Sequence, residues 1–202
     1  MKYFSIKGES VSEKIIERSR FMTYSLPVNT AERAKEYLEK IRKKHSDATH
    51  NCYCYKLKDG SVKFSDDGEP SGTAGAPIQE AVVASKLTNV IVIVTRYFGG
   101  IKLGAGGLTR AYFSCAKEGL DNAEKIEYIL SDIYQIELTY EEFYGASSFF
   151  NGDTVKVLNK EFGSGVTVEF AVAKNTEIEE KLASILNKKP TISRLKESYE
   201  IF

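Results

Sequence analysis

A cluster of glycines mixed with basic residues is the part of this sequence best suited to chemistry. It follows an apolar run of strand length at residues 89–95 and precedes a helical pattern that begins at Leu108. The glycines are Gly99, Gly100, Gly104, Gly106 and Gly107, and the cations beside them are Arg96, Lys102 and Arg110. Glycines let a ligand approach the backbone, and the helix behind them offers unpaired N–H groups and the positive end of its dipole. This order of strand, glycine-rich loop and helix predicts a binding site for an anion, most simply a phosphate.

The anion site has a structural alternative. The glycine spacing matches neither the P-loop nor the dinucleotide-binding fingerprint. The same residues could form a tight turn packed against neighbouring strands, with the basic side chains in solvent. Arg20, which the pattern places at the end of an early strand at 12–20, is a further candidate for the basic surface. Its own alternative is a solvated position on an edge strand.

An acidic loop at residues 65–75 is the second candidate site. Asp66, Asp67 and Glu69 lie close to Thr73 in the chain, and clustered oxygens of this kind can bind Mg²⁺ or serve acid–base catalysis. A loop that hydrogen-bonds its own backbone and caps the next helix would use the same residue types. We favour the structural interpretation because no nucleophile paired with a base stands out. His50, at the start of a predicted strand, could hydrogen-bond or bind a ligand.

Both histidines and two of the three cysteines lie within residues 45–55. A metal site is one interpretation of this segment. Its spacing fits no zinc signature, however, and Cys52 and Cys54 are more easily explained as strand residues that share one face. Cys115 makes the number of cysteines odd, and we expect reduced thiols and no bound metal.

Composition and charge restrict the class of protein. The 202 residues are 42% hydrophobic and 11% aromatic, and 28 basic residues balance 28 acidic ones. Residues 1–130 hold 20 Lys and Arg against 16 Asp and Glu, a net charge of +4, and residues 131–202 hold 8 against 12, a net charge of −4. Bulk charge therefore does not predict nucleic-acid binding, which would need a local patch. With no membrane-spanning run and no signal-peptide core, we expect a soluble cytoplasmic protein.

The surrounding patterns predict two domains and the α+β class. The first, at residues 1–130, contains short strands and a helix at 31–44 that Thr30 caps. The second, at residues 131–202, follows the order β-α-β-β-α-β of a ferredoxin-like unit. It includes a helix whose first turn reads as a capping box at Thr176 and Glu179.

Long contiguous motifs in this chain resemble the IMPACT family, in particular its bacterial YigZ-type branch. The matching segments are Arg18–Phe21, Ala48–Tyr53, Asp66–Gly75, Thr95–Gly104 and Gly106–Tyr112. The resemblance covers the whole chain, because YigZ-type proteins add a small ferredoxin-like domain similar to one in elongation factor G.

The resemblance implies a fold and a biological setting. It implies an N-terminal two-layer α/β domain like the second domain of a small-subunit ribosomal protein, a fold shared with kinases that hold phosphates on a glycine-rich loop. It also implies a link to translation control, since eukaryotic relatives regulate a kinase of an initiation factor. No settled enzymatic activity accompanies the family.

Two functions follow as hypotheses. The first is non-catalytic binding of RNA, the ribosome or another phosphate-bearing partner of the translation machinery, through the glycine loop and its cations. The second is a small-molecule enzyme in which Asp66, Asp67 and Glu69 hold Mg²⁺ while the glycine loop holds the phosphate of a nucleotide. We favour binding because no complete catalytic constellation can be named.

Overall fold

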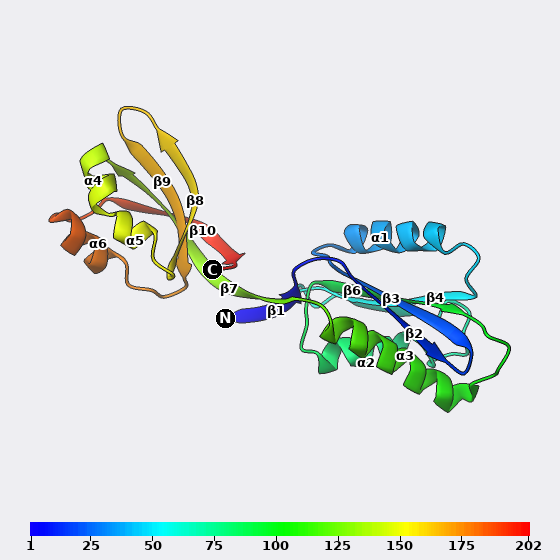
Figure 1. Cartoon of the computed structure of the whole chain (residues 1–202). Helices are drawn as coiled ribbons and strands as arrows, with labels where there is room; N and C mark the ends of the chain where they lie inside the picture. The colour runs from blue at the N-terminus through cyan, green and yellow to red at the C-terminus, as the bar shows by residue number, and fades with distance from the viewer. The chain divides into compact units, whose positions relative to one another are not determined.

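The chain forms two compact units in the computed structural model, which describes residues 1–202. One unit comprises Phe4–Ile126, and the other combines Met1–Tyr3 with Glu127–Phe202 (Figure 1). Each unit combines helices with a β-sheet, which confirms the α+β class. None of the helices has the length and apolar character needed to cross a membrane.

The N-terminal unit is built on a five-stranded sheet in which neighbouring strands are antiparallel. In spatial order the strands are β2 (Ser10–Ile16), β3 (Ser19–Pro27), β6 (Val90–Tyr97), β4 (His50–Lys56) and β5 (Val62–Ser65). The central strand β6 has no polar alternation, and it is buried on both faces as the sequence predicted. Its alternate side chains therefore enter two separate cores.

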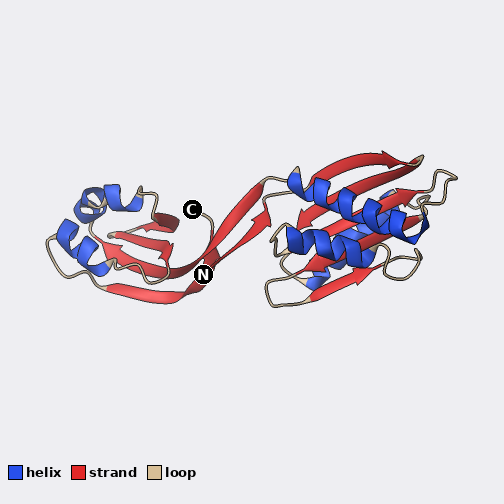
Figure 2. Ribbon diagram, turned by 90° about the horizontal axis from the view of Figure 1, so that it is seen from below, coloured by secondary structure: helices blue, strands red, loops and turns tan.

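Helices cover both faces of this sheet. α1 (Ala31–Lys44) packs on one face against Ile91 and Ile93 of β6. α2 (Gly75–Ala84) and α3 (Gly104–Asp121) pack on the other face against the even-numbered valines of that strand. Figure 1 shows α1 on one side of the sheet, and Figure 2 shows the side that α2 and α3 cover. The domain therefore has three layers, with helices on both faces of the sheet, where two layers were expected. The third layer forms because β6 presents apolar side chains to both sides.

Local signals set two boundaries in this unit. The Thr30 side chain accepts a hydrogen bond from the backbone N of Arg33 at 3.2 Å and caps α1, as predicted. Between β2 and β3, Glu17 and Arg18 have positive φ angles of 46° and 65°. The strand expected at 12–20 is therefore divided by a tight turn, and Arg20 lies at the start of β3.

The C-terminal unit has the ferredoxin-like arrangement. Its strands are β7 (Lys125–Leu138), β8 (Val155–Phe162), β9 (Val166–Ala173) and β10 (Ile192–Glu200). β10 and β9 pair with β7 over overlapping residues, so they occupy its two edges, and β8 pairs with β9. This β10-β7-β9-β8 order confirms the predicted topology. The N-terminal residues join this unit through β1 (Lys2–Ile6), which also pairs with β7.

The helices of this unit differ in detail from the sequence pattern. α4 (Tyr140–Gly145) and α5 (Ser147–Phe150) replace one expected helix, and α4 begins with a capping box formed by Thr139 and Glu142. α6 (Glu179–Leu186) begins later than expected. The capping box predicted at Thr176 is wrong, because the Thr176 hydroxyl donates to the carbonyl oxygen of Ala173 instead.

Candidate functional site

The glycine-rich segment forms a shorter loop than the sequence suggests. α3 begins at Gly104, so only residues 98–103 separate it from β6, and Gly106 and Gly107 belong to its first turn. Gly100 and Gly104 have positive φ angles of 86° and 68°, which glycine adopts without strain. The later glycines are poor helix formers on their own. The helix is held in place instead by the buried stripe from Leu108 onward, which packs on the sheet.

The N-terminus of α3 is open to a ligand. Its N-cap residue, Leu103, offers no side-chain hydrogen bond, and no acidic residue lies in the first turn. The first N–H groups of a helix have no partner within the helix. Gly104, Ala105 and Gly106 are exposed at this end, so the positive pole of the helix dipole faces solvent.

A cavity of about 440 Å³ adjoins this helix terminus. Its inner end is formed by His50, Glu69 and Arg96, which come from β4, the acidic loop and β6. Its walls include the apolar side chains of Phe98, Leu103, Pro70 and Leu108. Lys102 and the first residues of α3 complete the lining. Two groups of residues that the sequence singled out separately, the acidic loop and the glycine segment, therefore meet at one cavity.

Arg96 is a buried structural cation rather than an exposed anion ligand. Its Nη1 donates to Oε1 of Glu69 at 2.7 Å, and the two side chains are only 6% and 3% exposed. Its Nη2 donates to Oγ of Ser19 at 3.2 Å, while its Nε is buried without a hydrogen-bond partner. The guanidinium also lies 5.4 Å from the ring centre of Phe98. Because Glu69 neutralises it, Arg96 adds no net charge to the cavity.

Glu69 uses its two oxygens differently. Oε1 accepts hydrogen bonds from Arg96 and from the hydroxyl of Tyr112, the latter at 2.8 Å. Burial, followed by the neighbouring Cys52 and Glu69, raises the pKa of Tyr112, so its hydroxyl keeps its proton and donates. Oε2 makes no hydrogen bond and lies 3.7 Å from Nε2 of His50. One oxygen of a buried carboxylate thus remains available beside the cavity.

His50 has a defined tautomer. Its Nδ1 lies 2.8 Å from the backbone carbonyl oxygen of Asp67. Because a carbonyl oxygen can only accept, Nδ1 carries a hydrogen, and when the ring is neutral Nε2 is a hydrogen-bond acceptor. The side chain is 18% exposed and lines the cavity. His50 and Glu69 therefore present two neighbouring acceptors at the inner end.

The remaining acidic-loop residues hold the loop together. Asp66 accepts from the backbone N–H groups of Gly72, Ala74 and Gly75 at 2.8–3.0 Å, at the start of α2. Burial acts to raise the pKa of Asp66, but these N–H groups together lower it below its ordinary value. The structural interpretation of Asp66 agrees with these contacts.

Asp67 and Thr73 are also occupied. Asp67 accepts from Nη2 of Arg42 at 2.9 Å and from the backbone N of Asn51 at 2.6 Å, and the Thr73 hydroxyl donates to the carbonyl oxygen of Pro70. Nowhere do three His, Cys, Asp or Glu residues converge as metal ligands would. The enzyme hypothesis consequently lacks the ligand set that it assigned to Mg²⁺.

Apart from His50, the histidine and cysteines of the segment at 45–55 make structural contacts. His45 hydrogen-bonds to the hydroxyls of Tyr24 and Tyr97, at 2.6 and 2.7 Å, on the α1 face of the sheet. Cys52 donates to the carbonyl oxygen of Asp66, and the thiols of Cys52, Cys54 and Cys115 are all free and buried. Burial raises the pKa of the Cys54 thiol to about 12.

Lys102 and Arg110 are the unpaired cations of the glycine segment. Both are exposed, and neither forms an ion pair or a side-chain hydrogen bond. They line a second cavity of about 540 Å³, together with Glu17 of the β2–β3 turn. Arg20 does not join them. Its Nη2 pairs with Glu13 at 2.8 Å, and because its neighbour Phe21 packs under α3, Arg20 faces the α1 side of the sheet.

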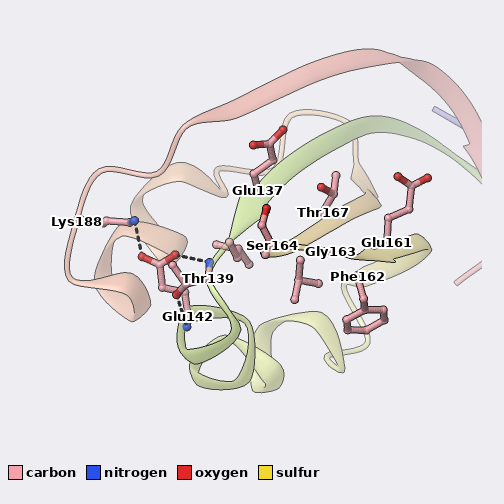
Figure 3. Close-up of a pocket in the computed structure, with 12 residues that line it drawn as sticks. Glu137, Thr139, Glu142, Glu161, Phe162, Gly163, Ser164, Thr167 and Lys188 are labelled. Carbon is pink, nitrogen blue, oxygen red and sulfur yellow. Dashed lines mark hydrogen bonds and ion pairs between the residues drawn. The ribbon is translucent and has the colours of Figure 1, made fainter.

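A further cavity, of about 570 Å³, lies in the C-terminal unit (Figure 3). The end of β7, the β8–β9 turn and the start of α4 form it. Glu137, Glu142 and Glu161 line it, and Glu142 pairs with Lys188 and accepts from the backbone N of Thr139 at 2.9 Å. The excess of carboxylates makes this cavity unsuitable for a phosphate.

Sequence reasoning missed Phe98, which lines the N-terminal cavity, and also Ser19 and Tyr112, which hydrogen-bond to the buried Arg96 and Glu69. Tyr112 belongs to the buried stripe of α3. A buried tyrosine hydroxyl requires a hydrogen-bond partner, so its presence in that stripe is the signal that could have indicated a polar group beneath. Nothing local indicated that this group is Glu69, 43 residues earlier.

Fold and site together define a class of α+β protein in which an antiparallel sheet carries a cavity at an uncapped helix N-terminus, with a ferredoxin-like unit in the same chain. The Impact N-terminal domain matches residues 17–120. YvyE of Bacillus subtilis, an IMPACT family member, is 45% identical over 140 residues, which are 68% of this chain and 64% of that protein. YigZ of Escherichia coli is 33% identical over 174 residues, or 83% of this chain and 85% of that one. This chain belongs to the IMPACT family.

One solved structure agrees with the fold over nearly the whole chain. A crystal structure of a hypothetical protein covers 96% of this chain and 98% of its own, with 27% identity and a TM-score of 0.64. The two-domain translational regulator Yih1 aligns over 58% of this chain and 46% of its own, with 26% identity. Its TM-score of 0.35 is too low for its structure to inform this one.

Proposed function

We propose that this protein is a non-catalytic RNA-binding protein of the translation machinery, with the N-terminus of α3 as its phosphate contact. The observation that carries the proposal is the pair of exposed cations, Lys102 and Arg110, which have no carboxylate partner beside an uncapped helix N-terminus. Backbone N–H groups, the helix dipole and nearby ammonium or guanidinium groups favour an anion together. Arg96 supports this surface from below rather than touching the phosphate.

Translation is the setting that family membership favours. The chain belongs to the IMPACT family. The likeness to ribosomal and elongation-factor domains that the family resemblance implies favours the ribosome or its RNA as the partner. Three free, buried thiols suit a reducing compartment, and we place the protein in the cytoplasm. Ribosomal RNA supplies the repeated phosphates that an exposed positive surface recognises.

Phosphate contacts predict a definite dependence on salt. Each phosphate neutralised on a single strand contributes a slope of about −0.7 to the logarithm of affinity against the logarithm of salt concentration. If Lys102 and Arg110 each contact one phosphate, removal of both side chains lowers the magnitude of that slope by about 1.4. The change in slope reports the contacts themselves, because a general loss of fold would abolish binding at every salt concentration.

Fluorescence anisotropy with a labelled single-stranded RNA, over a series of potassium chloride concentrations, tests the proposal. The variant Lys102→Ala/Arg110→Ala should bind more weakly at low salt and with the shallower slope. Lys35→Ala/Lys43→Ala is the matched control, because it removes two exposed cations from α1 on the opposite face of the sheet. Unchanged binding by the first variant, or an affinity of the parent protein that does not vary with salt, would overturn the proposal.

A further inference from the structure

We propose that the 440 Å³ cavity at the N-terminus of α3 binds a guanine nucleotide, free or as an unstacked residue of RNA. The base enters between the apolar walls, its Watson–Crick edge meets Glu69 and His50, and its phosphate lies at the helix N-terminus. This inference rests on the proposed function, because it assigns the base that belongs to the bound phosphate.

The cavity has the size and walls that a single base requires. Its volume falls within the range of about 300–1,000 Å³ typical of small-ligand sites. Phe98 lines it with 46% of its surface exposed, so its ring is accessible to a ligand. Leu103 and Leu108 supply further apolar surface. RNA-binding proteins commonly stack unpaired bases on exposed aromatic rings of this kind.

The inner end of the cavity demands hydrogen-bond donors from its ligand. Oε2 of Glu69 makes no hydrogen bond although the side chain is 97% buried, since only 3% of it is exposed. Nε2 of His50, the neighbouring acceptor, is 3.7 Å away. Both residues line the cavity, and a ligand with two adjacent donors would satisfy both atoms. Arg96 also lines this end, with its Nε buried and unpartnered.

Guanine is the base whose Watson–Crick edge fits these acceptors. It carries two neighbouring donors, the ring N1–H and the exocyclic amino group. Adenine and cytosine each place an acceptor next to their amino group, and uracil flanks its single N–H with two carbonyl oxygens. Against Glu69 and His50 those acceptors would meet acceptors, which leaves buried polar groups unpaired and discriminates strongly.

The open end of the cavity suits the phosphate. Lys102, Gly104 and Ala105 line it there, so an ammonium group and the unpaired N–H groups of α3 lie on the same side. A nucleotide with its base at the inner end would therefore place its negative charge beside the positive pole of the helix. Guanosine, which lacks the phosphate, should bind more weakly than guanosine monophosphate, and the difference should shrink as salt rises.

The test compares the four nucleoside monophosphates and guanosine by isothermal titration calorimetry with the whole protein. We expect guanosine monophosphate to bind at least about 10-fold more tightly than the other three. Glu69→Gln is the informative variant, because its amide oxygen can still accept from Arg96 and Tyr112 while its NH₂ replaces Oε2 at the cavity. This exchange of an acceptor for a donor should abolish the preference for guanine.

Phe98→Ala provides a second variant, which removes the ring over Arg96 but keeps the hydrogen-bond partners of Arg96, Glu69 and Tyr112. It should weaken all four nucleotides by a similar factor, and Lys35→Ala/Lys43→Ala should change none of them. Equal affinities for the four bases, no binding at millimolar concentration, or a retained guanine preference in a folded Glu69→Gln variant would overturn the inference.

The two proposals fail in different ways. Salt-dependent RNA binding through Lys102 and Arg110 without any base preference would refute the guanine site and leave the proposed function standing. Selective binding of guanosine monophosphate, combined with no binding of single-stranded RNA rich in guanine, would support the cavity assignment and refute the RNA-binding function. Selective binding of guanosine monophosphate together with binding of guanine-rich RNA would support both proposals.

Discussion

Removing the buried guanidinium tests the arrangement on which the site depends. Arg96→Met keeps most of the aliphatic stem but deletes the charge that faces Glu69 at 2.7 Å. Glu69 would then retain one hydrogen-bond donor, the Tyr112 hydroxyl, while its side chain stays 3% exposed. The variant therefore leaves a largely buried carboxylate without the guanidinium that neutralised it.

The expected cost is large for a single substitution. Breaking a buried ion pair by removing one partner destabilises proteins by about 3–5 kcal/mol. Arg42→Met is the matched control, since Arg42 also pairs with a carboxylate, that of Asp67, but the two side chains are 36% and 28% exposed. A pair of that exposure contributes about 0–1 kcal/mol. The two substitutions remove the same group, so the difference between them isolates the effect of burial.

Urea unfolding followed by tyrosine fluorescence measures both variants, because the chain has 12 tyrosines and no tryptophan. With a typical slope of about 1–3 kcal/mol per molar urea, Arg96→Met should lower the midpoint by roughly 1–5 M. Arg42→Met should lower it by a small fraction of that. The double variant Arg96→Met/Glu69→Leu should recover much of the loss, since apolar pairs often replace buried ion pairs well. Equal effects of the two single variants would refute the buried-pair interpretation.

Two further predictions concern the loops around the cavity. The folded-state pKa of Asp66 is lowered, so its contribution to stability is present above the unfolded-state pKa of about 3.9 and is lost as pH falls through the folded-state pKa. Asp66→Asn should therefore reduce the loss of stability at acid pH. An unchanged loss would contradict the role of Asp66 at the start of α2. A Cβ at Gly99 would meet the carbonyl oxygen of Arg18 at 2.0 Å, whereas one at Gly8 would meet nothing within 4 Å. Gly99→Ala should therefore lower the thermal midpoint strongly and Gly8→Ala only slightly, and similar midpoints would show that the turn can move aside.

Elements with strong local patterns could be predicted from the sequence. The β-branched run of β6 is apolar on both sides, which predicts a strand between two cores. Thr30 and the terminal cations of α1 set the limits of that helix through capping and the dipole. In the C-terminal unit, the order of strands and helices alone predicts the ferredoxin-like topology, since few connections are compatible with it.

The start of α3 could not be predicted in the same way. Gly104, Gly106 and Gly107 favour a loop by intrinsic propensity, and packing of the residues that follow draws them into the helix. The capping box expected at Thr176 does not form, because the Thr176 hydroxyl instead donates a hydrogen bond within a turn, to the carbonyl oxygen of Ala173. Both errors concern boundaries, where local preference is weakest.

The partner of Arg96 lies beyond any local pattern. Glu69 is 27 residues away in the chain, and the two meet only because the acidic loop folds over the end of β6. From the sequence, Arg96 resembles the other cations of its segment. Burial separates it from Lys102, which is exposed, so the two residues that looked equivalent have different functions.

If the cavity binds a guanine nucleotide as proposed, that separation would let one small site supply both affinity and selectivity. Arg96 and Glu69 cancel in charge, so the inner end of the cavity offers hydrogen-bond acceptors with little net field. The positive charges of Lys102 and of the α3 N-terminus have no carboxylate partner at the open end, where they attract a phosphate whatever base it carries. If the ion pair were absent and Glu69 ionised alone, its negative charge would repel the phosphate that the rim attracts. In the proposed guanine site, the buried pair would therefore let a carboxylate contact the base without opposing the charge of the nucleotide's phosphate.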